Sequence, residues 1–274
     1  MPREISKFLA AALLVLLLAS ACRRSEPGTG SNTGQSNPVQ EAHNPSPAPV
    51  QSPKAALPAA PGEKSAAGKT LYLTFDADMT PGMLEREKQH RVDKWYSPGL
   101  IDYLVENKIP ATIFSTGMFA EDYPELITQL AASGQFSIQN HTYDHAAFST
   151  PCYGLPTVSS DDAKNQEMSR ASAVIVRLTG QEPVYLRHPG LCHKLHDDQL
   201  AEQMGLKLSD TGTVSGDAFA RDPKLVAQSI LSGAPHNPVI ILHLGGPNAR
   251  ATEEAIKLVV PKLLAQGYTF AKLQ

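Results

Sequence analysis

From residue 70 to the C-terminus, short apolar runs alternate with longer segments whose apolar residues recur at helical spacing. The apolar runs predict strands over residues 71–75, 110–115, 136–140, 184–187, 206–209, 239–243 and 268–273. The segments with helical spacing predict helices over residues 97–107, 123–132, 161–178, 195–204, 223–231 and 252–264. Alternating strands and helices favour parallel pairing, with the sheet buried beneath helices. The pattern therefore predicts an α/β fold, either a doubly wound sheet or a barrel.

Residues suited to chemistry lie at the carboxyl ends of these predicted strands. They are, in chain order, Asp76 and Asp78, His141 and His145, Arg187, Asp210, and His243. In a parallel barrel, catalytic residues come from the carboxyl ends of several strands, which all meet at one face. We therefore expect these side chains to share an active site. Taken singly, each has an ordinary alternative, such as a strand-end carboxylate, a structural ion pair or a core histidine.

The spacing of His141 and His145 indicates a metal site. Residues four apart lie on one face of a helical turn, so both imidazoles can reach a single cation. Two imidazoles with a carboxylate suit zinc or a neighbouring divalent first-row metal. The pair alone is more typical of surface or capping histidines, but Asp76 and Asp78 at the end of another strand add the carboxylate that favours metal binding.

The N-terminus has the pattern of an export signal over residues 1–21. Two basic residues, Arg3 and Lys7, precede an apolar run over residues 8–18, and small residues follow it. The run is shorter than the about 20 residues that span a bilayer. Two interpretations stay open. Ordinary cleavage after Ala21 gives a secreted protein, whereas a lipoprotein-type signal puts a lipid on Cys22 and anchors the protein in a membrane, facing the periplasm or the cell surface.

Composition divides the remainder of the chain. Residues 23–69 contain eight prolines and no Phe, Trp or Tyr. Such a segment cannot bury enough apolar surface to fold, so residues 22–69 are expected to be a disordered tether ahead of one catalytic domain over residues 70–274. The formal net charge of −3 argues against a nucleic-acid partner, which needs a basic face. In an oxidising exported compartment, Cys152 and Cys192 can form an intrachain disulfide, and the sequence leaves this open.

Five segments in order resemble the motifs of the polysaccharide deacetylase (NodB-homology) family of metal-dependent carbohydrate esterases. They are Thr74-Phe75-Asp76-Ala77-Asp78, His141-Thr142-Tyr143-Asp144-His145, Arg187-His188-Pro189-Gly190, the segment from Ser209 to Asp217, and Ile240-Ile241-Leu242-His243. The second matches its family motif, H-[S/T]-x-x-H, in full. The resemblance runs from about residue 70 to 274 and implies a distorted (β/α)7 barrel in a single catalytic domain.

The resemblance implies a hydrolase that removes N-acetyl groups from an amino-sugar polysaccharide, such as peptidoglycan or a chitin-like glycan. A zinc ion, or cobalt, nickel or manganese in its place, would be held by Asp78, His141 and His145, and its bound water would attack the amide. Asp76, which matches the Asp of the first motif, would be the general base. His243 would be the general acid that protonates the departing amine.

Further roles follow from the same resemblance. Arg187 would orient the general base and would itself pair with Asp217 or Asp210. The backbone N–H of Gly190 occupies the position of the family's oxyanion donor. Strand alternation puts Ile241 on the same face as the general acid, so we expect it to line the pocket for the acetyl methyl group.

Three positions depart from the family pattern. Ala77 stands where the metal-binding Asp is usual, and the carboxylate comes one residue later at Asp78. Gly190 replaces an aromatic residue of the groove wall, and Ala218 replaces a Trp. These departures keep two alternatives open. One is a catalytically inactive surface lipoprotein that binds glycan or metal, and the other is a hydrolase of O-acetyl esters or non-sugar amides.

Overall fold

The computed structural model describes residues 69–274, so the predicted signal, the tether up to residue 68 and Cys22 lie outside the described residues. The strands are β1 (Lys69–Ala77), β2 (Ala111–Ser115), β3 (Phe136–Asn140), β4 (Tyr185–Leu186), β5 (Lys207–Leu208), β6 (Thr213–Val214), β7 (Val239–His243) and β8 (Tyr268–Ala271). They form one parallel sheet in the order β5-β4-β3-β2-β1-β7-β6, and β8 pairs with the first half of β1. Within residues 69–274 no pairing joins β5 to β6, so the predicted α/β barrel is confirmed as an open half-barrel.

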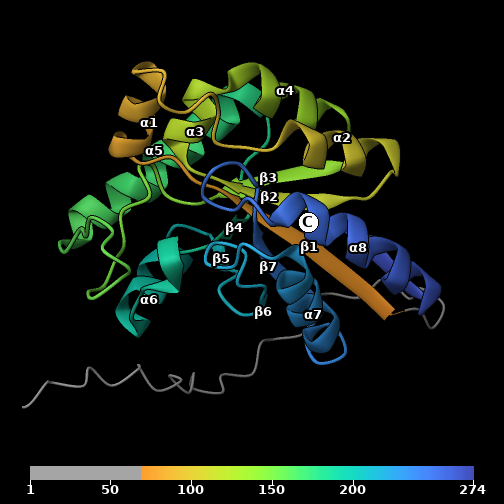
Figure 1. The fold of residues 1–274 in the computed structure, drawn as a ribbon. Coiled ribbons are helices and arrows are strands. Elements are labelled where there is room, and N and C mark those ends of the chain that lie inside the picture. The colour runs from red at the N-terminus through yellow and green to blue at the C-terminus, as the bar shows by residue number, and fades with distance from the viewer. Residues whose placement is uncertain (1–68) are drawn as a thin grey trace, which may run out of the picture. The chain divides into compact units, whose positions relative to one another are not determined.

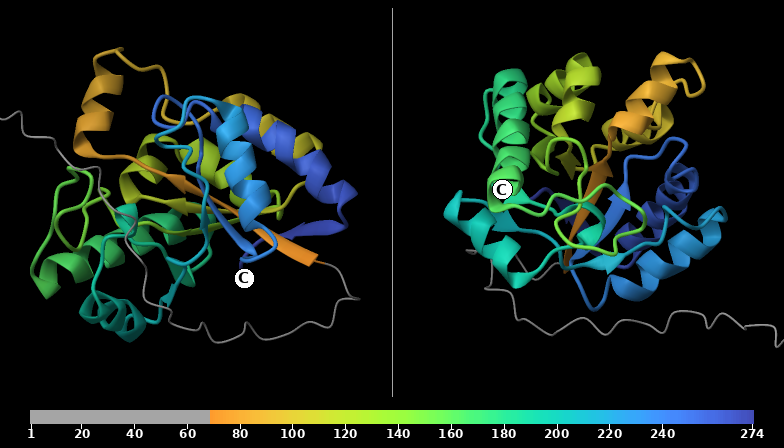
Figure 2. Two further views of the ribbon diagram at one scale, coloured as in Figure 1. Left: turned by 60° about the horizontal axis from the view of Figure 1, so that its bottom comes forward. Right: turned by 90° about the vertical axis from the view of Figure 1, so that its left-hand side faces the viewer.

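Helices cover the outer side of this sheet, as Figures 1 and 2 show. They are α1 (Pro81–Lys88), α2 (Pro98–Glu106), α3 (Gly117–Asp122), α4 (Pro124–Ala132), α5 (Asp161–Thr179), α6 (Leu195–Gln203), α7 (Pro223–Gly233) and α8 (Thr252–Ala265), with the 3-10 turn η1 (Pro189–Leu191). Every predicted helix and strand is present, whereas α1, α3, η1 and the two-residue β6 were not predicted. No helix in the described part of the chain is long and apolar enough to cross a bilayer.

The starts of four helices are fixed by side-chain caps. The hydroxyl groups of Thr80, Ser97, Thr116 and Ser160 accept hydrogen bonds of 3.1, 3.2, 3.1 and 3.3 Å from the N–H group three residues on. Each cap satisfies a donor that the first helical turn leaves free, which stabilises a helix by about 1 kcal/mol. Serine and threonine at these positions therefore set where α1, α2, α3 and α5 begin.

Residues on β1 alternate between the two faces of the sheet. The odd-numbered residues from Leu71 to Ala77 are buried in the main hydrophobic core beneath the helices. Thr74 and Asp76 are buried on the opposite, inner face, where the hydroxyl of Thr74 donates to the carbonyl of Ile240 at 2.7 Å. The period of two along a strand thus directs the carboxylate of Asp76 into the half-barrel.

The neighbouring strand β7 follows the same rule. Ile240 and Leu242 belong to the main core, whereas Ile241 is buried outside it and lies on the same side of the strand as His243. In the parallel register, His243 is the direct partner of Asp76. The sheet therefore brings the two residues together before any loop contributes.

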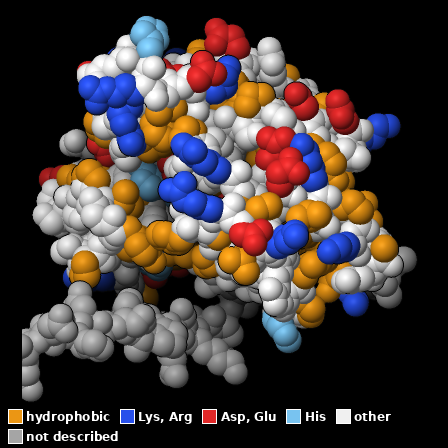
Figure 3. All heavy atoms as spheres, viewed as in Figure 1, with side chains coloured by type: hydrophobic (Ala, Val, Ile, Leu, Met, Phe, Trp, Pro, Cys, Tyr) orange, Lys and Arg blue, Asp and Glu red, His pale blue; other side chains and the backbone are white. Residues whose placement is uncertain are grey.

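Charged side chains of both signs are spread over the surface. On the face seen in Figure 3, basic and acidic groups are interspersed rather than gathered into a field of one sign. This distribution agrees with the small formal net charge of the chain.

A disulfide joins two loops at the carboxyl ends of the strands. Cys152, in the loop after β3, is bonded to Cys192, which directly follows η1, with 5.9 Å between the Cα atoms. The carbonyl of Cys192 also accepts hydrogen bonds of 3.1 Å from the N–H groups of Phe148 and Ser149. The pairing that the sequence left open is therefore present, and it ties the loop after β3 to the loop after β4.

We expect the double variant Cys152→Ser/Cys192→Ser to unfold at lower urea concentration. The bond closes a loop with a sequence separation of 40 residues, and the loss of loop-closure constraint at that length is worth about 4 kcal/mol. Urea unfolding of the two proteins measures the difference, and wild type treated with reductant should behave like the variant. An unchanged midpoint in both would contradict the stabilising role.

Candidate metal centre and active site

Three side chains converge at the carboxyl ends of β1 and β3. The Oδ1 atom of Asp78 lies 3.4 Å from Nε2 of His141 and 3.4 Å from Nε2 of His145. The three residues are 7, 1 and 7 % exposed. The carboxylate of Asp78 therefore faces both imidazoles, although Asp78 lies one residue after the motif position that Ala77 occupies.

The spacing of these atoms fits a divalent cation. Zinc bonds to nitrogen and oxygen measure about 2.0–2.2 Å, so neighbouring ligands of a tetrahedral site lie about 3.3–3.6 Å apart. The Oδ1 atom of Asp78 is buried and has no hydrogen-bond partner. A buried carboxylate oxygen without a partner is costly unless a cation binds it. Two imidazoles and one carboxylate leave a fourth position open, as catalytic zinc sites do.

The segment from His141 to His145 is a loop, so the helical turn predicted from its spacing is wrong. Thr142 and His145 adopt the left-handed conformation, with φ of 63° and 65°. The side-chain carbonyl of Asn140 accepts the N–H of Thr142 at 2.8 Å, and this hydrogen bond turns the chain directly after β3. The two imidazoles therefore meet through a tight turn at the strand end rather than through helical periodicity.

Contacts from other elements hold this loop. Glu167 on α5 accepts the N–H groups of Tyr143 and Asp144 at 2.9 and 3.0 Å. The Nδ1 atom of His141 lies 2.8 Å from the carbonyl oxygen of Arg187. When Nδ1 donates to that carbonyl, Nε2 carries no proton and presents its lone pair to the cation site.

Arg187 is completely buried and fully partnered. Its Nη1 donates to Oδ1 of Asp76 at 2.8 Å, which is the contact expected from the sequence. Its other donors go to Ser209, with Nε to the carbonyl at 2.8 Å and Nη2 to the hydroxyl at 3.2 Å. The guanidinium carbon also lies 4.1 Å from the centroid of the Phe114 ring. The predicted pairing of Arg187 with Asp217 or Asp210 is wrong, because Ser209 satisfies these donors.

Asp217 instead positions His243. Its Oδ1 lies 2.9 Å from Nδ1 of His243, and its Oδ2 accepts the backbone N–H of His243 at 2.7 Å. The hydroxyl of Thr252, at the start of α8, donates to the same Oδ2 at 2.7 Å. These bonds turn Nε2 of His243 toward the cation site, where it lies 3.7 Å from Oδ2 of Asp78.

Burial and charge act against each other in this site. Burial lowers the pKa of His243, but the carboxylates of Asp217 and Asp78 outweigh it and raise the pKa to about 10. Burial would raise the pKa of Asp78, but the imidazoles of His145, His243 and His141 hold it well below its usual range. Burial lowers the pKa of His145 to about 4. The carboxylates thus favour the protonated form of His243, and burial favours the neutral form of His145.

The remaining predicted residues border this site. Gly190 lies in η1 with φ of 62°, and a Cβ atom there would be 2.6 Å from Sγ of Cys152, so a side chain at this position would clash. Ile241 is buried on the inner side of β7, two residues before His243. Ile241 therefore lies on the side of β7 that strand alternation predicts.

Several contributing residues were missed from the sequence. Nδ2 of Asn248 donates to Oδ2 of Asp78 at 3.3 Å, so the loop after β7 also reaches the cation site. The Gly245-Gly246-Pro247-Asn248 turn directly after His243 was the available signal for this loop. Glu167 and Thr252 carried no signal, because each acts from a helix remote in sequence.

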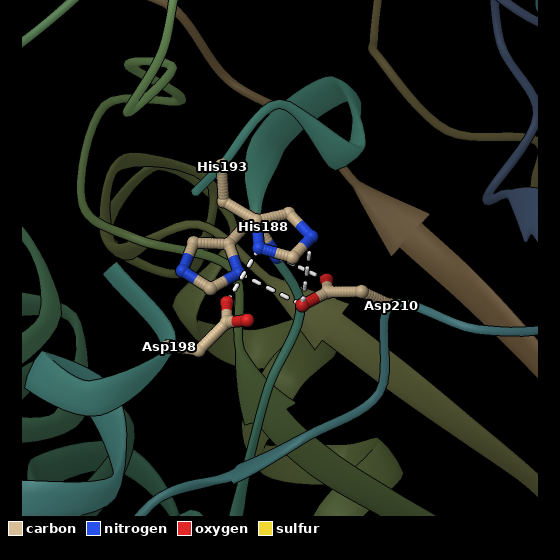
Figure 4. A group of neighbouring side chains, drawn as sticks. All are labelled: His188, His193, Asp198 and Asp210. Carbon is tan, nitrogen blue, oxygen red and sulfur yellow. Dashed lines mark hydrogen bonds and ion pairs between the residues drawn. The ribbon is translucent and has the colours of Figure 1, made fainter. Parts of the chain in front are cut away.

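A second group of histidines and aspartates lies beside Arg187 in sequence and is drawn in Figure 4. Asp210 accepts the backbone N–H of His188 at 2.8 Å and contacts its Nδ1 at 2.8 Å. Asp198 contacts Nδ1 of His193 at 2.5 Å, and the two imidazole rings stack 4.4 Å apart. These separations are those of hydrogen bonds and are shorter than the ligand spacing of a tetrahedral metal site. The group therefore fastens the loop after β4 to the loop after β5.

We expect Asp210→Asn to lower the free energy of unfolding by about 2 kcal/mol at pH 7, because charge-assisted hydrogen bonds are lost. Burial would raise the pKa of Asp210, but His188 and His193 hold it below its usual range. A depressed pKa stabilises the fold above the ordinary value near 4, and that stabilisation is lost as the pH falls. Urea unfolding should therefore show that the difference in the free energy of unfolding between wild type and Asp210→Asn decreases as the pH falls below about 4.

Asp161→Asn is the matched control for this prediction. Asp161 pairs with His196 at 2.9 Å, but both side chains are more than half exposed. Such a pair contributes less than about 1 kcal/mol. Equal effects of the two substitutions, or a difference for Asp210→Asn that is independent of pH, would contradict the buried role of Asp210.

Comparison with known proteins identifies the family. Residues 63–209 match the polysaccharide deacetylase family. The chain belongs to this family. It is a family of hydrolases, so the predicted membership and enzyme class are confirmed at that level.

Individual relatives are distant. The chain is 26% identical over 210 residues to the peptidoglycan-N-acetylmuramic acid deacetylase PdaA of Bacillus subtilis. The aligned region covers 75% of this chain and 70% of that protein. Other curated relatives are covered over as little as 39% of their length.

In a solved structure, the Bc1960 peptidoglycan N-acetylglucosamine deacetylase aligns with a TM-score of 0.63 at 20% identity, over 76% of this chain and 87% of that one. BA3943 of Bacillus anthracis, described as a CE4 family pseudoenzyme, aligns with a TM-score of 0.60 at 17% identity, over 76% and 64%. These two solved structures share the fold of this chain.

Proposed function

We propose that this protein is a metal-dependent hydrolase that removes N-acetyl groups from an amino-sugar polysaccharide of the peptidoglycan or chitin type. The arrangement of Asp78, His141 and His145 carries the proposal, because an unpartnered carboxylate oxygen lies 3.4 Å from a nitrogen of each imidazole. The names of the curated relatives, which refer to peptidoglycan and chitooligosaccharides, support the class of substrate.

A divalent cation held by these three residues supplies the Lewis acid that polarises the acetyl carbonyl and activates a water molecule. The donor set suits zinc, with cobalt, nickel or manganese as alternatives. No other residue type is needed to hold the ion, since the fourth position is left for water and substrate.

Asp76 is the proposed general base. Its carboxylate lies on the inner face of the sheet, next to His243 in the register of β1 and β7. The 2.8 Å contact with buried Arg187 fixes the orientation of the carboxylate. Asp76 can then take a proton from the attacking water as the oxygen–carbon bond forms.

His243 is the proposed general acid. Asp217 holds Nδ1, so Nε2 faces the site and can donate its proton to the departing amine nitrogen as the carbon–nitrogen bond breaks. The products are acetate and a free amino sugar. The N–H of Gly190 is proposed to donate to the carbonyl oxygen, and Ile241 to contact the acetyl methyl group.

Purified protein loaded with zinc or cobalt should release acetate from N-acetylglucosamine oligomers or peptidoglycan. His141→Ala should reduce this release to that of the protein treated with chelator, because the cation loses a ligand. His90→Ala is the control, since His90 is exposed and has no role in the site. An acetate assay on amide and ester substrates measures all three proteins.

Activity on acetyl esters but on no amide would support the alternative of an O-acetyl esterase. If metal-loaded wild type releases acetate from neither class, the hydrolase proposal fails. The inactive surface protein would then be preferred.

Substitution of Ala77 separates the hydrolase from the inactive binding protein. The side chain of Ala77 lies in the hydrophobic core, on the opposite face from Asp76. We expect Ala77→Asp to destabilise the fold by about 3 kcal/mol or more, because it buries an unpaired charge, and to give no gain in acetate release. Ala77→Asn, which has the same size without the charge, should destabilise less. If Ala77→Asp released more acetate than wild type, the hypothesis that the natural protein is a catalytically inactive binding protein would be favoured.

The proposal includes export, since peptidoglycan and related glycans lie outside the cytoplasm. We further propose a lipid on Cys22, with secretion of the cleaved protein as the alternative. The residues from 22 to 68 would then connect the lipid to the catalytic domain. Metabolic labelling with a fatty acid, compared between wild type and Cys22→Ser, distinguishes the two.

A further inference from the structure

Two exposed aromatic side chains lie against each other in the loops that follow β3 and β6. Tyr153 is 74% exposed and Phe219 is 72% exposed, and they are the aromatic members of the exposed large hydrophobic residues in 69–274. Their ring centroids are 5.6 Å apart, with 44° between the ring planes. Contiguous apolar surface left in water marks a binding surface more often than an accident of packing.

The backbone holds Tyr153 in an unusual conformation. Tyr153 and Gly154 have φ of 47° and 76°, and the N–H of Leu155 donates to the carbonyl of Cys152 at 2.8 Å. This is a tight turn whose first central residue is not a glycine, so the tyrosine is strained there. The disulfide from Cys152 fastens the turn. Strain of this kind is retained at ligand-binding positions.

The turn lies against the segment that carries Gly190. The Cδ2 atom of Tyr153 is 3.3 Å from the position that a Cβ of Gly190 would take. Gly190 follows Arg187 by three residues, and Arg187 contacts Asp76. The ring of Tyr153 thus occupies the space next to a position that has no side chain of its own.

Phe219 reaches the ring of Tyr153 from the loop after β6. It follows Asp217, which positions His243, by two residues, and its N–H donates to the carbonyl of Gly216 at 3.0 Å. The loops that carry Tyr153 and Phe219 follow β3 and β6, which lie on opposite sides of β1 and β7. The aromatic pair therefore joins a loop from each side of the two central strands, β1 and β7, which carry Asp76 and His243.

We propose that Tyr153 and Phe219 form a stacking surface for a sugar ring of the glycan, namely a ring adjacent to the one that is deacetylated. This inference rests on the proposed function. One face of a pyranose presents C–H groups, which pack on the electron-rich face of an aromatic ring and remove its apolar surface from water. The sugar that loses its acetyl group must reach the cation site, so a ring stacked at the rim belongs to a neighbouring unit of the polymer.

The surface predicts a dependence on chain length. Tyr153→Ala and Phe219→Ala should each lower the ratio of kcat/KM between a hexamer of N-acetylglucosamine and the shortest oligomer turned over, by about three- to tenfold. The loss should appear mainly in KM, because stacking at the rim does not change during the reaction. Tyr153→Phe should keep the ratio of wild type, since the ring is retained.

Leu195→Ala is the control for loss of exposed apolar surface. Leu195 is 73% exposed and has no place in the site, so its substitution should leave the ratio unchanged. Equal losses on short and long oligomers in the Tyr153 and Phe219 variants would overturn the proposal, because they would indicate a general effect on the loops.

Binding of the hexamer tests the stacking surface without turnover. If wild type releases no acetate, the proposed function fails, and calorimetric titration of the hexamer still tests the surface, since Tyr153→Ala should weaken binding. Unchanged binding would overturn it. Sedimentation of wild type and variants tests whether a second copy of the chain covers the pair, and a dimer lost in Tyr153→Ala would also overturn the sugar assignment.

Discussion

The buried carboxylate of Asp78 is the constraint on which the site depends. A negative charge with 7% exposure is unstable in a protein interior unless positive charge or hydrogen bonds surround it. Here Asn248 and three imidazoles surround it, yet Oδ1 accepts no hydrogen bond. The protein therefore keeps a position of negative potential, in which the carboxylate oxygen lies 3.4 Å from each of two imidazole nitrogens, a spacing that suits tetrahedral ligands of a cation. Binding of a cation there would offset the cost of burying this charge.

Arg187 links this position to the rest of the site. Its side chain joins Asp76 to Ser209, and its carbonyl oxygen orients His141. A fully buried guanidinium is tolerated only when its donors are satisfied, so the loss of any one partner affects the others. The ends of β1, β3, β4 and β5 are coupled through this one residue.

The sequence predicted what depends on local pattern. The inner and outer faces of β1 and β7 follow from period-two alternation, and their parallel register brings Asp76 beside His243. Pairings between loops were not predictable in the same way. Arg187 was expected to pair with Asp217 or Asp210, but Ser209 takes its donors and Asp217 contacts His243 instead, because only the three-dimensional path of the loops decides which acceptor reaches which donor. The turn at His141 was misjudged because four-residue spacing suits a helix, whereas Asn140 accepts the N–H of Thr142 and ends regular structure there.

The departure from the family pattern at Gly190 has a physical cause in this chain. The left-handed φ of 62° already disfavours a side chain, and the Sγ of Cys152 lies 2.6 Å from where a Cβ would be. The disulfide thus requires a glycine here, because an aromatic residue at this position would displace the bridge. The ring of Tyr153, carried by that bridge, lies beside Gly190 instead. In the proposed stacking surface, a neighbouring loop would therefore supply the aromatic ring that the third motif lacks.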